Sequence, residues 1–488
     1  MKIEIKKTDA AAKFSLLIVP LFSKTDYGSG MPEQLSLPLK NRTADFKAGT
    51  GETMLLMPED ENLPAKIILV GMGKKDKFDG EKARNTGAVS VRATGKYLPV
   101  ETAFLLIPSM AKYAGELAEG FVMGNYSPAK YQTGKNLKKN KKHDLKKITV
   151  LCAAVDKKIA RQLELGVASG LAVNEVRDMV NAPPVIKTVD YLVEKSRESA
   201  RSSGSKVTVL DLKQIEKLKM GGILGVSRGA EHPPKIVILE HKPFGSGKDP
   251  IVIVGKGIIF DSGGYNLKPR DAIRDMQLDM AGAAAIIGLF RLLRANNVRK
   301  HVIGIYALTD NLIGSKAQKP SDIVLMHGGR SVEITNTDAE GRLVLGDLVS
   351  YASKKWNPKY MVDIATLTGA CMIALGDRYA GVMGNDSALV EKIVRAGKQC
   401  GELVWELPLH PDYAARMKSK LADYRNWDEV PYAGASKGAA FIGFFTGKTK
   451  WAHLDIAGPA FTLNPKKYET TMATGYGVRL LLEFLKGI

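Results

Sequence analysis

Acidic and basic residues stand at the ends of apolar runs in the second half of the chain, where they could do chemistry. The apolar run Ile251–Val254 is followed by Lys256, and the next apolar run ends at Asp261 before two glycines. Asp279 stands near the start of an alanine-rich apolar stretch that we expect to form a buried helix. Burying an unpaired charge is very costly, so these residues should have charged partners or metal ions. They therefore predict the rim of a polar site.

A further segment carries two acids separated by one residue. Asp338 and Glu340 precede a helical pattern of apolar residues that begins at Leu343. Side chains at positions i and i+2 face the same way in an extended backbone, so we expect this segment to be extended and its carboxylates to grip one cation. Gly341 would permit a tight turn after them, and Arg342 would reach back toward the same centre.

The acids together predict a site for a pair of divalent metal ions. Asp261, Asp279, Asp338 and Glu340 would repel one another if they were bare, and shared cations would keep all four ionised. Each residue also has a simpler interpretation. Asp279 and Asp338 could cap helices, and Lys256 could be a solvated lysine at a strand end. The metal site is favoured because the acidic segments fall at strand ends or helix starts, where α/β active sites form.

The rest of the sequence predicts an α/β protein with a mainly parallel central sheet covered by helices. Short β-branched runs alternate with helical patterns, which is the order that places helices on the faces of parallel strands. We expect strands in the second half of the chain at 206–210, 235–239, 251–254, 301–307 and 360–364. The apolar runs of the first half lie at 15–20, 66–70, 103–107 and 148–151.

Two domains are expected, joined by a helix. The first is a smaller α/β domain over residues 1–155, and the second is a large catalytic domain over residues 186–488. Between them, residues 157–180 show apolar residues at helical spacing, and the proline pair at 183–184 ends that pattern. We therefore assign 156–185 to a linker helix.

The second domain resembles the leucyl aminopeptidase (cytosol aminopeptidase) family, of the bacterial aminopeptidase A type. The segment 336–342 reads Asn-Thr-Asp-Ala-Glu-Gly-Arg, which matches the signature heptapeptide of that family without a departure. The resemblance extends through 254–257, 260–264, 267–269, 279–284, 365–370 and 451–458, and it covers the first domain only weakly.

The resemblance implies a role for each residue of the site. Lys256, Asp261, Asp279 and Glu340 would hold the tighter metal, and Asp261, Asp338 and Glu340 the more exchangeable one. Lys268 would contact the substrate carbonyl, and Arg342 would hold a bicarbonate that serves as general base. Further family positions would form the substrate pocket: Met276, Asn336, Ala339, Thr366, Leu367 and Gly369. Two metals would then activate a water that attacks the peptide bond, releasing single N-terminal residues, with leucine-like residues preferred.

The resemblance also implies a homo-hexamer that acts on peptide substrates. The ligand set is oxygen-rich with one nitrogen, which suits Mn²⁺, Zn²⁺ or Mg²⁺. As a metal ligand, Lys256 must be the neutral amine, although a free lysine has a pKa of about 10.4.

Composition favours a cytoplasmic protein without a membrane span. The chain has 488 residues with 45% hydrophobic and 25% charged residues, and its apolar runs are too short to cross a bilayer. The start of the chain suits a strand better than a signal peptide, and the cysteines, Cys152, Cys371 and Cys400, lie far apart, as in a reducing compartment. The net charge of +20 leaves nucleic-acid binding possible, but no nucleic-acid motif supports it.

Two other chemistries have partial sequence support. Residues 434–438 fit the G-x-S-x-G nucleophile elbow of serine hydrolases around Ser436, but the preceding residues form a poor strand. Residues 245–248 read Gly-Ser-Gly-Lys, but they lack the upstream glycine of a phosphate loop and are followed by Asp249 and Pro250 instead of a helix start.

Overall fold

Two compact units make up the chain in the computed structural model, which describes residues 1–23, 45–97, 101–136, 145–465 and 468–488. Unit 1 comprises Met1–Asn174 and Asn464–Thr471, and unit 2 comprises Glu175–Leu463 and Met472–Ile488. The division falls inside helix α5 (Lys157–Asn181), so the helix that the sequence predicts at 157–180 is present. Most of the lysine-rich stretch that begins near residue 135 lies outside the described residues.

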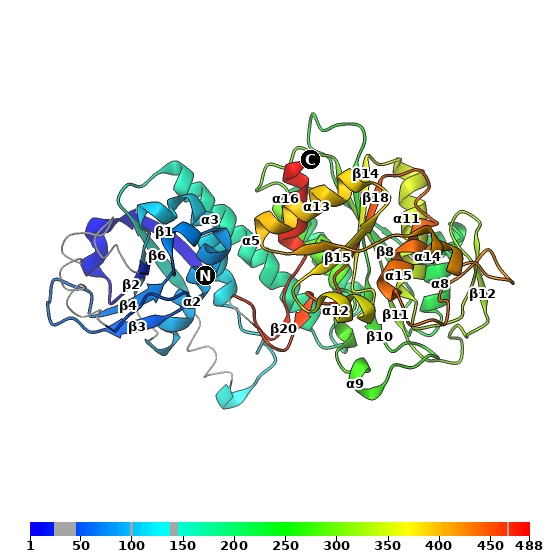
Figure 1. Ribbon diagram of the computed structural model, residues 1–488, viewed down its shortest axis with the longest axis horizontal. Coiled ribbons are helices and arrows are strands. Elements are labelled where there is room, and N and C mark those ends of the chain that lie inside the picture. Colours follow the sequence, from blue (N-terminus) through cyan, green and yellow to red (C-terminus); the bar gives the residue numbers. More distant parts are fainter. Residues whose placement is uncertain (24–44, 98–100, 137–144, 466–467) are drawn as a thin grey trace. The chain divides into compact units, whose positions relative to one another are not determined.

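Unit 1 contains a six-stranded sheet in the order β1-β6-β5-β2-β4-β3, in which β3 alone is antiparallel to its neighbour (Figure 1). Gly87 and Gly120 let the backbones of the helices at 80–94 and 114–124 come into direct contact. A Cβ at Gly120 would lie only 1.9 Å from the carbonyl oxygen of Arg84. The elements of unit 1 are the strands β1 (Lys2–Lys7), β2 (Leu16–Leu21), β3 (Thr53–Leu56), β4 (Lys66–Gly71), β5 (Thr102–Leu105) and β6 (Lys147–Cys152), and the helices α2 (Gly80–Thr94) and α3 (Ala114–Gly124).

The described part of unit 2 contains a nine-stranded sheet in the order β16-β15-β18-β14-β9-β11-β8-β7, with β10 paired to β11. Its strands are β7 (Lys206–Leu210), β8 (Lys235–His241), β9 (Ile251–Gly255), β10 (Ile258–Asp261), β11 (Val302–Asn311), β14 (Tyr360–Ala365), β15 (Ala380–Gly384), β16 (Val404–Glu406) and β18 (Trp451–Asp455). The strands around β9 are parallel, whereas β8 is antiparallel to both of its neighbours and β15 is antiparallel to β18. The predicted mainly parallel sheet is therefore confirmed.

Helices cover this sheet in two groups. One group packs on β9, β11 and β14 through α10 (Ala281–Leu292), which contacts α6 (Val189–Ser203) and α16 (Val478–Gly487). Helix α13 (Ser387–Cys400) packs in turn on α16, and the two are adjacent in Figure 1. The other packs on the same strands through α11 (Gly341–Trp356), with α8 (Gly221–Ser227) and α15 (Gly434–Gly443). Strand alternation explains the two layers: Val252 and Val254 share a buried cluster with Leu345 of α11, while Gly255 faces Ala283 of α10.

Smaller elements connect these layers. They are the strands β12 (Ile323–Leu325), β13 (Ser331–Glu333), β17 (Tyr424–Arg425), β19 (Phe461–Thr462) and β20 (Met472–Ala473), and the helices α7 (Leu212–Lys217), α9 (Arg270–Ile273), α12 (Gly369–Leu375) and α14 (Pro411–Arg416). No helix among the described residues combines the length and the apolar character that a membrane crossing needs. The three cysteines are buried, and no disulfide joins them.

Candidate metal centre

The carboxyl ends of the parallel strands meet the starts of two helices in unit 2, and the predicted ligands lie where they meet. Lys256 directly follows β9, and Asp261 is the last residue of β10. Asp279 lies two residues before α10, and Glu340 directly precedes α11. Neither helix start has a side-chain capping hydrogen bond, so the interpretation of Asp279 and Asp338 as simple helix caps finds no support.

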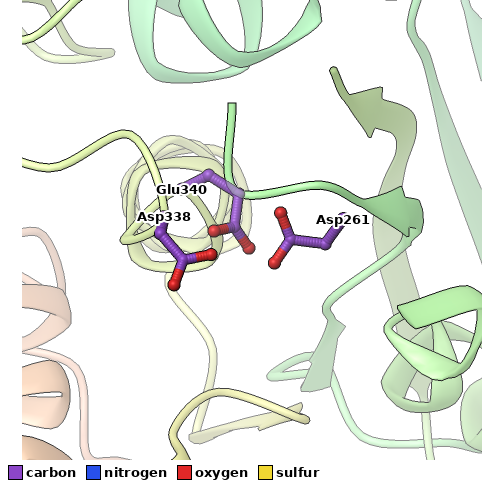
Figure 2. Close-up of side chains that lie close together, drawn as sticks. All are labelled: Asp261, Asp338 and Glu340. Carbon is purple, nitrogen blue, oxygen red and sulfur yellow. The ribbon is translucent and has the colours of Figure 1, made fainter. Parts of the chain in front are cut away.

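Three carboxylates form a compact group. One oxygen from each of Asp261, Asp338 and Glu340 lies within 4.8 Å of the other two, and Figure 2 shows the three groups gathered between the end of β10 and the start of α11. Asp261 and Glu340 are buried, whereas 34% of the Asp338 side chain is exposed. The group is therefore closed on the side of the sheet and reaches solvent at Asp338.

The backbone that carries Asp338 and Glu340 differs from our expectation. The segment forms a turn, because the amide of Ala339 donates to the carbonyl of Asn336 at 3.2 Å and the amide of Asp338 donates to Oδ1 of Asn336 at 2.7 Å. Glu340 already has helical backbone angles (φ −76°, ψ −38°). The predicted extended segment is wrong, and a turn that leads into a helix brings the two acids together instead.

Lys256 links Asp279 to this group. Its Nζ lies 2.8 Å from an oxygen of Asp279 and 2.8 Å from an oxygen of Glu340, and it donates to the carbonyl of Thr366 at 3.1 Å. Burial alone would lower the pKa of this lysine, but the carboxylates of Asp279, Glu340 and Asp261 outweigh burial and raise it. Without a neighbouring cation, Lys256 is therefore an ammonium ion.

Lys268 stands on the partly exposed side of the same group. Its Nζ lies 2.8 Å from Asp261 and 2.5 Å from Asp338, and its side chain is 15% exposed. The loop before it turns at Gly263, which has a left-handed φ of 86°, and a Cβ there would lie 2.9 Å from an oxygen of Asp338. Burial acts to lower the pKa of Lys268, and the surrounding carboxylates raise it overall.

Glu340, Asp279 and Asp338 hold their protons more tightly than usual. Burial raises the pKa of Glu340 to about 8, with repulsion from Asp261 adding to the effect, and burial raises the pKa of Asp279 to about 6. Burial also raises the pKa of Asp338. Two ammonium groups thus fail to compensate the four acids fully, which is the electrostatic condition under which divalent cations bind well.

The donor atoms also fit metal ions. Oδ2 of Asp279, Oδ1 of Asp338 and Oε1 of Glu340 are buried, and each faces a cation, because a lysine Nζ lies 2.8, 2.5 and 2.8 Å away, respectively. Carboxylate oxygens with one amine nitrogen form a hard ligand set that suits Mn²⁺, Mg²⁺ or Zn²⁺.

Arg342 lies in the first turn of α11 and is buried. Its guanidinium donates to the carbonyl of Asn426 at 2.9 Å, while its Nε has no hydrogen-bond partner within the described part of the chain. Burial lowers its pKa to about 10, although Glu340 and other acids nearby act to raise it. The side chain therefore stays charged near neutral pH and keeps a donor available.

The six predicted pocket residues surround the same strand ends. Thr366 follows β14, and its hydroxyl donates to Asp279 at 2.7 Å. Met276 begins the 3-10 turn η5 (Met276–Leu278), which ends directly before Asp279, and Gly369 begins α12. Asn336 and Ala339 belong to the turn that carries Asp338, and Leu367 is half-buried beside Thr366.

Two asparagines that sequence reasoning missed support the acids. Asn311 ends β11, and its Nδ2 donates to Asp261 at 2.7 Å and to the carbonyl of Thr337 at 3.1 Å. Its place at the end of a core strand was a signal that could have identified it. Asn426 contacts the turn from a segment 90 residues later in the sequence, and nothing local distinguishes it.

The structure does not support the two alternative interpretations, a serine hydrolase and a phosphate-binding loop. Ser436 lies in the first turn of α15, buried, and the residues from Asn426 to Ala433 that precede this helix form no strand. Residues 245–248 lead through Pro250 into strand β9, not into the helix that a phosphate loop requires.

Sequence comparisons find relatives along most of the chain. The model described as the cytosol aminopeptidase family, catalytic domain, matches residues 174–482, and the model of that family's N-terminal domain matches residues 37–135. A probable cytosol aminopeptidase of Geotalea uraniireducens is 40% identical over 438 residues, which cover 87% of this chain and 86% of the relative. A probable cytosol aminopeptidase of Chlorobium phaeobacteroides is 40% identical over 456 residues, which cover 91% and 90%.

Solved structures are similar over nearly the whole length. A mutant of tomato leucine aminopeptidase has a TM-score of 0.86 at 29% identity, and the match covers 99% of this chain and 96% of that chain. The bottromycin maturation enzyme BotP in complex with Mn has a TM-score of 0.85 at 29% identity, and the match covers 97% and 99%.

Proposed function

From the premise that the chain belongs to the cytosol aminopeptidase family, we propose that it releases single N-terminal residues from peptides with the help of two divalent metal ions. Aminopeptidase activity, and with it the class of hydrolase, follows from the family. The observation that carries the metal dependence is the group formed by Asp261, Asp338 and Glu340, whose oxygens lie within 4.8 Å of one another.

The ligands divide into two overlapping sets. The tighter ion would be held by Lys256, Asp261, Asp279 and Glu340, and the more exchangeable ion by Asp261, Asp338 and Glu340. The greater exposure of Asp338 supports this order, because an ion beside it would exchange with solvent more readily. When bound, the two ions lower the pKa of water, stabilise a developing oxyanion and attract the free amine of a peptide. The Mn in the similar BotP structure supports Mn²⁺, and Zn²⁺ suits the same ligands.

Two basic residues act on the substrate side of the site. Lys268 lies next to both Asp261 and Asp338, so its ammonium stands where it would stabilise negative charge developing on a substrate carbonyl. Arg342 would hold a bicarbonate that serves as general base. The unpartnered Nε of this buried arginine supports that role, since it offers a donor to an anion.

The pocket residues would select the first side chain of the peptide. Met276, Ala339 and Leu367 supply apolar surface beside the acids, and the open surroundings of Gly369 leave space for a bulky residue. A leucine-like first residue is therefore the expected preference.

A peptide assay tests this proposal. We expect a peptide that begins with leucine to lose one residue at a time, whereas its N-acetylated analogue stays intact because its amine is blocked. A chelator should abolish the reaction, and a serine-directed fluorophosphonate should not. Inhibition by the fluorophosphonate alone, or equal cleavage of both peptides, would exclude the metal-dependent mechanism.

The larger organisation of the protein is part of the same proposal. We assign 1–155 to an N-terminal domain, 156–185 to a linker helix and 186–488 to the catalytic domain, in a cytoplasmic homo-hexamer. The hexamer is what the resemblance to the family implies, and the three buried cysteines, which no disulfide joins, support a reducing compartment. Sedimentation equilibrium would test the assembly, because six chains of 52.9 kDa give a mass of about 317 kDa (6 × 52.9). A monomer mass at micromolar concentration would contradict the assembly.

A further inference from the structure

Asn426 lies behind the turn that carries Asp338 and Glu340. It directly follows β17, which pairs with β13, the strand that leads into the turn, and its own amide donates to the carbonyl of Glu333 at 3.1 Å. The side chain is fully buried, with 0% exposure. Asn426 is therefore fixed by its backbone next to the segment 335–340.

The side-chain amide of Asn426 binds both ends of the turn. Its Oδ1 accepts from the amides of Thr335 at 2.9 Å and Asn336 at 3.2 Å. The hydroxyl of Thr335 lies 3.2 Å from the same oxygen and donates to the carbonyl of Trp427 at 2.6 Å. Its Nδ2 donates to the carbonyls of Asn336 at 2.6 Å and Ala339 at 3.3 Å. One side chain thus connects the residue that enters the turn with the residue directly before Glu340.

The position of Asn426 is itself supported by a buried ion pair. The Asp428 side chain is fully buried and forms ion pairs with the buried Lys437 and, at 3.2 Å, with Arg416. Lys437 also donates to the carbonyl of Val430 at 2.6 Å. Breaking a buried ion pair by removing one partner is strongly destabilising, so this arrangement resists displacement of the loop.

The chemistry of the turn accepts only a carboxamide at this position. The oxygen of the side chain faces two backbone N–H donors, and its nitrogen faces two carbonyl oxygens. An aspartate would place an oxygen against the carbonyls of Asn336 and Ala339, and an alanine would leave backbone groups buried without partners.

We propose that Asn426 is a positioning residue that holds the 335–340 turn in the shape that brings Asp338 and Glu340 to Asp261. The inference deepens the proposed function and rests on it where it concerns metal binding. Among the described residues, Asn426 makes no hydrogen bond to any of the three carboxylates, so it would act on the metals through the backbone it fixes.

Three variants test this role. Asn426→Asp reverses the polarity of one side of the amide. Thr335→Val keeps the shape of the side chain but removes the hydroxyl that joins the turn to the Asn426 segment, through the carbonyl of Trp427 at 2.6 Å and beside Oδ1 of Asn426 at 3.2 Å. Asn385→Ala is the matched control, because Asn385 also accepts from one backbone amide (Trp451, 2.7 Å) and donates to one carbonyl (Thr449, 3.0 Å), at strand ends that carry no site residue.

Two measurements apply to each variant. The first is hydrogen–deuterium exchange of the peptide 331–343 in chelator-treated protein, which reports the turn without any metal. The second is calorimetric titration of the stripped protein with Mn²⁺. We expect faster exchange in this peptide and an Mn²⁺ affinity weakened about 10- to 100-fold for Asn426→Asp, with a smaller effect for Thr335→Val and none at the turn for Asn385→Ala. Excess Mn²⁺ should restore most of the activity that Asn426→Asp loses.

The outcomes separate this inference from the proposed function. Unchanged exchange of the peptide 331–343 in Asn426→Asp and Thr335→Val would overturn the positioning role, whatever the metal does. If Asn426→Asp does not fold, Asn426→Ser, which also removes the carboxamide but adds no charge, takes its place in both measurements, and unchanged exchange in it would overturn the positioning role. If wild-type protein binds no Mn²⁺, Zn²⁺ or Mg²⁺, the proposed function fails, and the exchange result still decides whether Asn426 holds the turn.

Discussion

The charge balance of the site depends on Lys256, because its ammonium lies between two buried acids. With Asp279 and Glu340 each 2.8 Å away, it compensates charge that a metal ion would otherwise compensate. The same lysine would have to lose its proton to become a ligand, and an adjacent cation would drive that loss. Lys256 would therefore be an ammonium ion among the carboxylates alone and a neutral amine beside a bound metal ion.

Replacing Lys256 should remove one metal and leave the other. We expect Lys256→Ala to retain about one ion per chain, because Asp261, Asp338 and Glu340 keep the more exchangeable site, and to lose most activity. Metal content after gel filtration, measured by mass spectrometry, would show this directly. Two retained ions, or none, would contradict the assignment of Lys256 to the tighter site.

Asp347 offers a pH test that is separate from the metal centre. It is buried within α11 and accepts from the amides of Ile223 at 2.9 Å and His327 at 2.7 Å. Burial raises its pKa to about 7, whereas an unfolded aspartate has a pKa of about 3.9. The folded state therefore holds a proton that the unfolded state releases, so this stabilisation is complete below about pH 4 and is lost as the pH rises through 7.

Melting temperatures of chelator-treated protein would show this dependence. From pH 5 to 7, the melting temperature of the wild type should fall relative to that of Asp347→Asn, since asparagine cannot ionise. Above pH 7 the difference between the two melting temperatures should level off. A difference that stays constant across this range would show that Asp347 has an ordinary pKa.

At the scale of elements, the start of α11 is packed directly against the end of β9. A Cβ at Gly341 would lie 2.7 Å from both Cε and Nζ of Lys256. A lysine end would normally move aside, but this one is held by two carboxylates. The glycine is therefore required by close approach, not by its backbone angles.

Gly341→Ala should consequently disturb the site without changing any charge. We expect a loss of activity of about tenfold or more, because small displacements of catalytic groups can cost up to about 100-fold. Gly247→Ala is the control, since a Cβ there meets nothing within 4 Å. Equal activity of both variants with wild type would show that the helix start tolerates the methyl group.

The sequence predicted best those elements whose pattern is local. Strands at 206–210 and 251–254 follow from β-branched runs, and the placing of Lys256 and Asp261 at strand ends follows from them. The turn at 336–339 could not be predicted, because it depends on Asn426, which is distant in sequence. The short strands β15 and β16 at the sheet edge also have little periodic signal, and they pair through long-range contacts.

At the scale of the whole molecule, the net charge of +20 predicts non-specific attraction to polyanions. No nucleic-acid motif accompanies it, so binding to duplex DNA should depend on charge alone. We expect any retention on DNA at about 50 mM salt to disappear by about 200 mM, as counterion release requires. A complex that survives the higher salt and prefers one sequence would instead indicate a dedicated DNA surface.

The most direct measurement is a titration of chelator-stripped protein with Mn²⁺ while leucine p-nitroanilide hydrolysis is followed. We predict no activity without metal, and a rise that reaches its plateau at two ions per chain, with N-acetyl-leucine p-nitroanilide untouched throughout. Full activity in the stripped protein, or no activity with Mn²⁺, Zn²⁺, Mg²⁺ or Co²⁺, would contradict a two-metal aminopeptidase built on Asp261, Asp338 and Glu340.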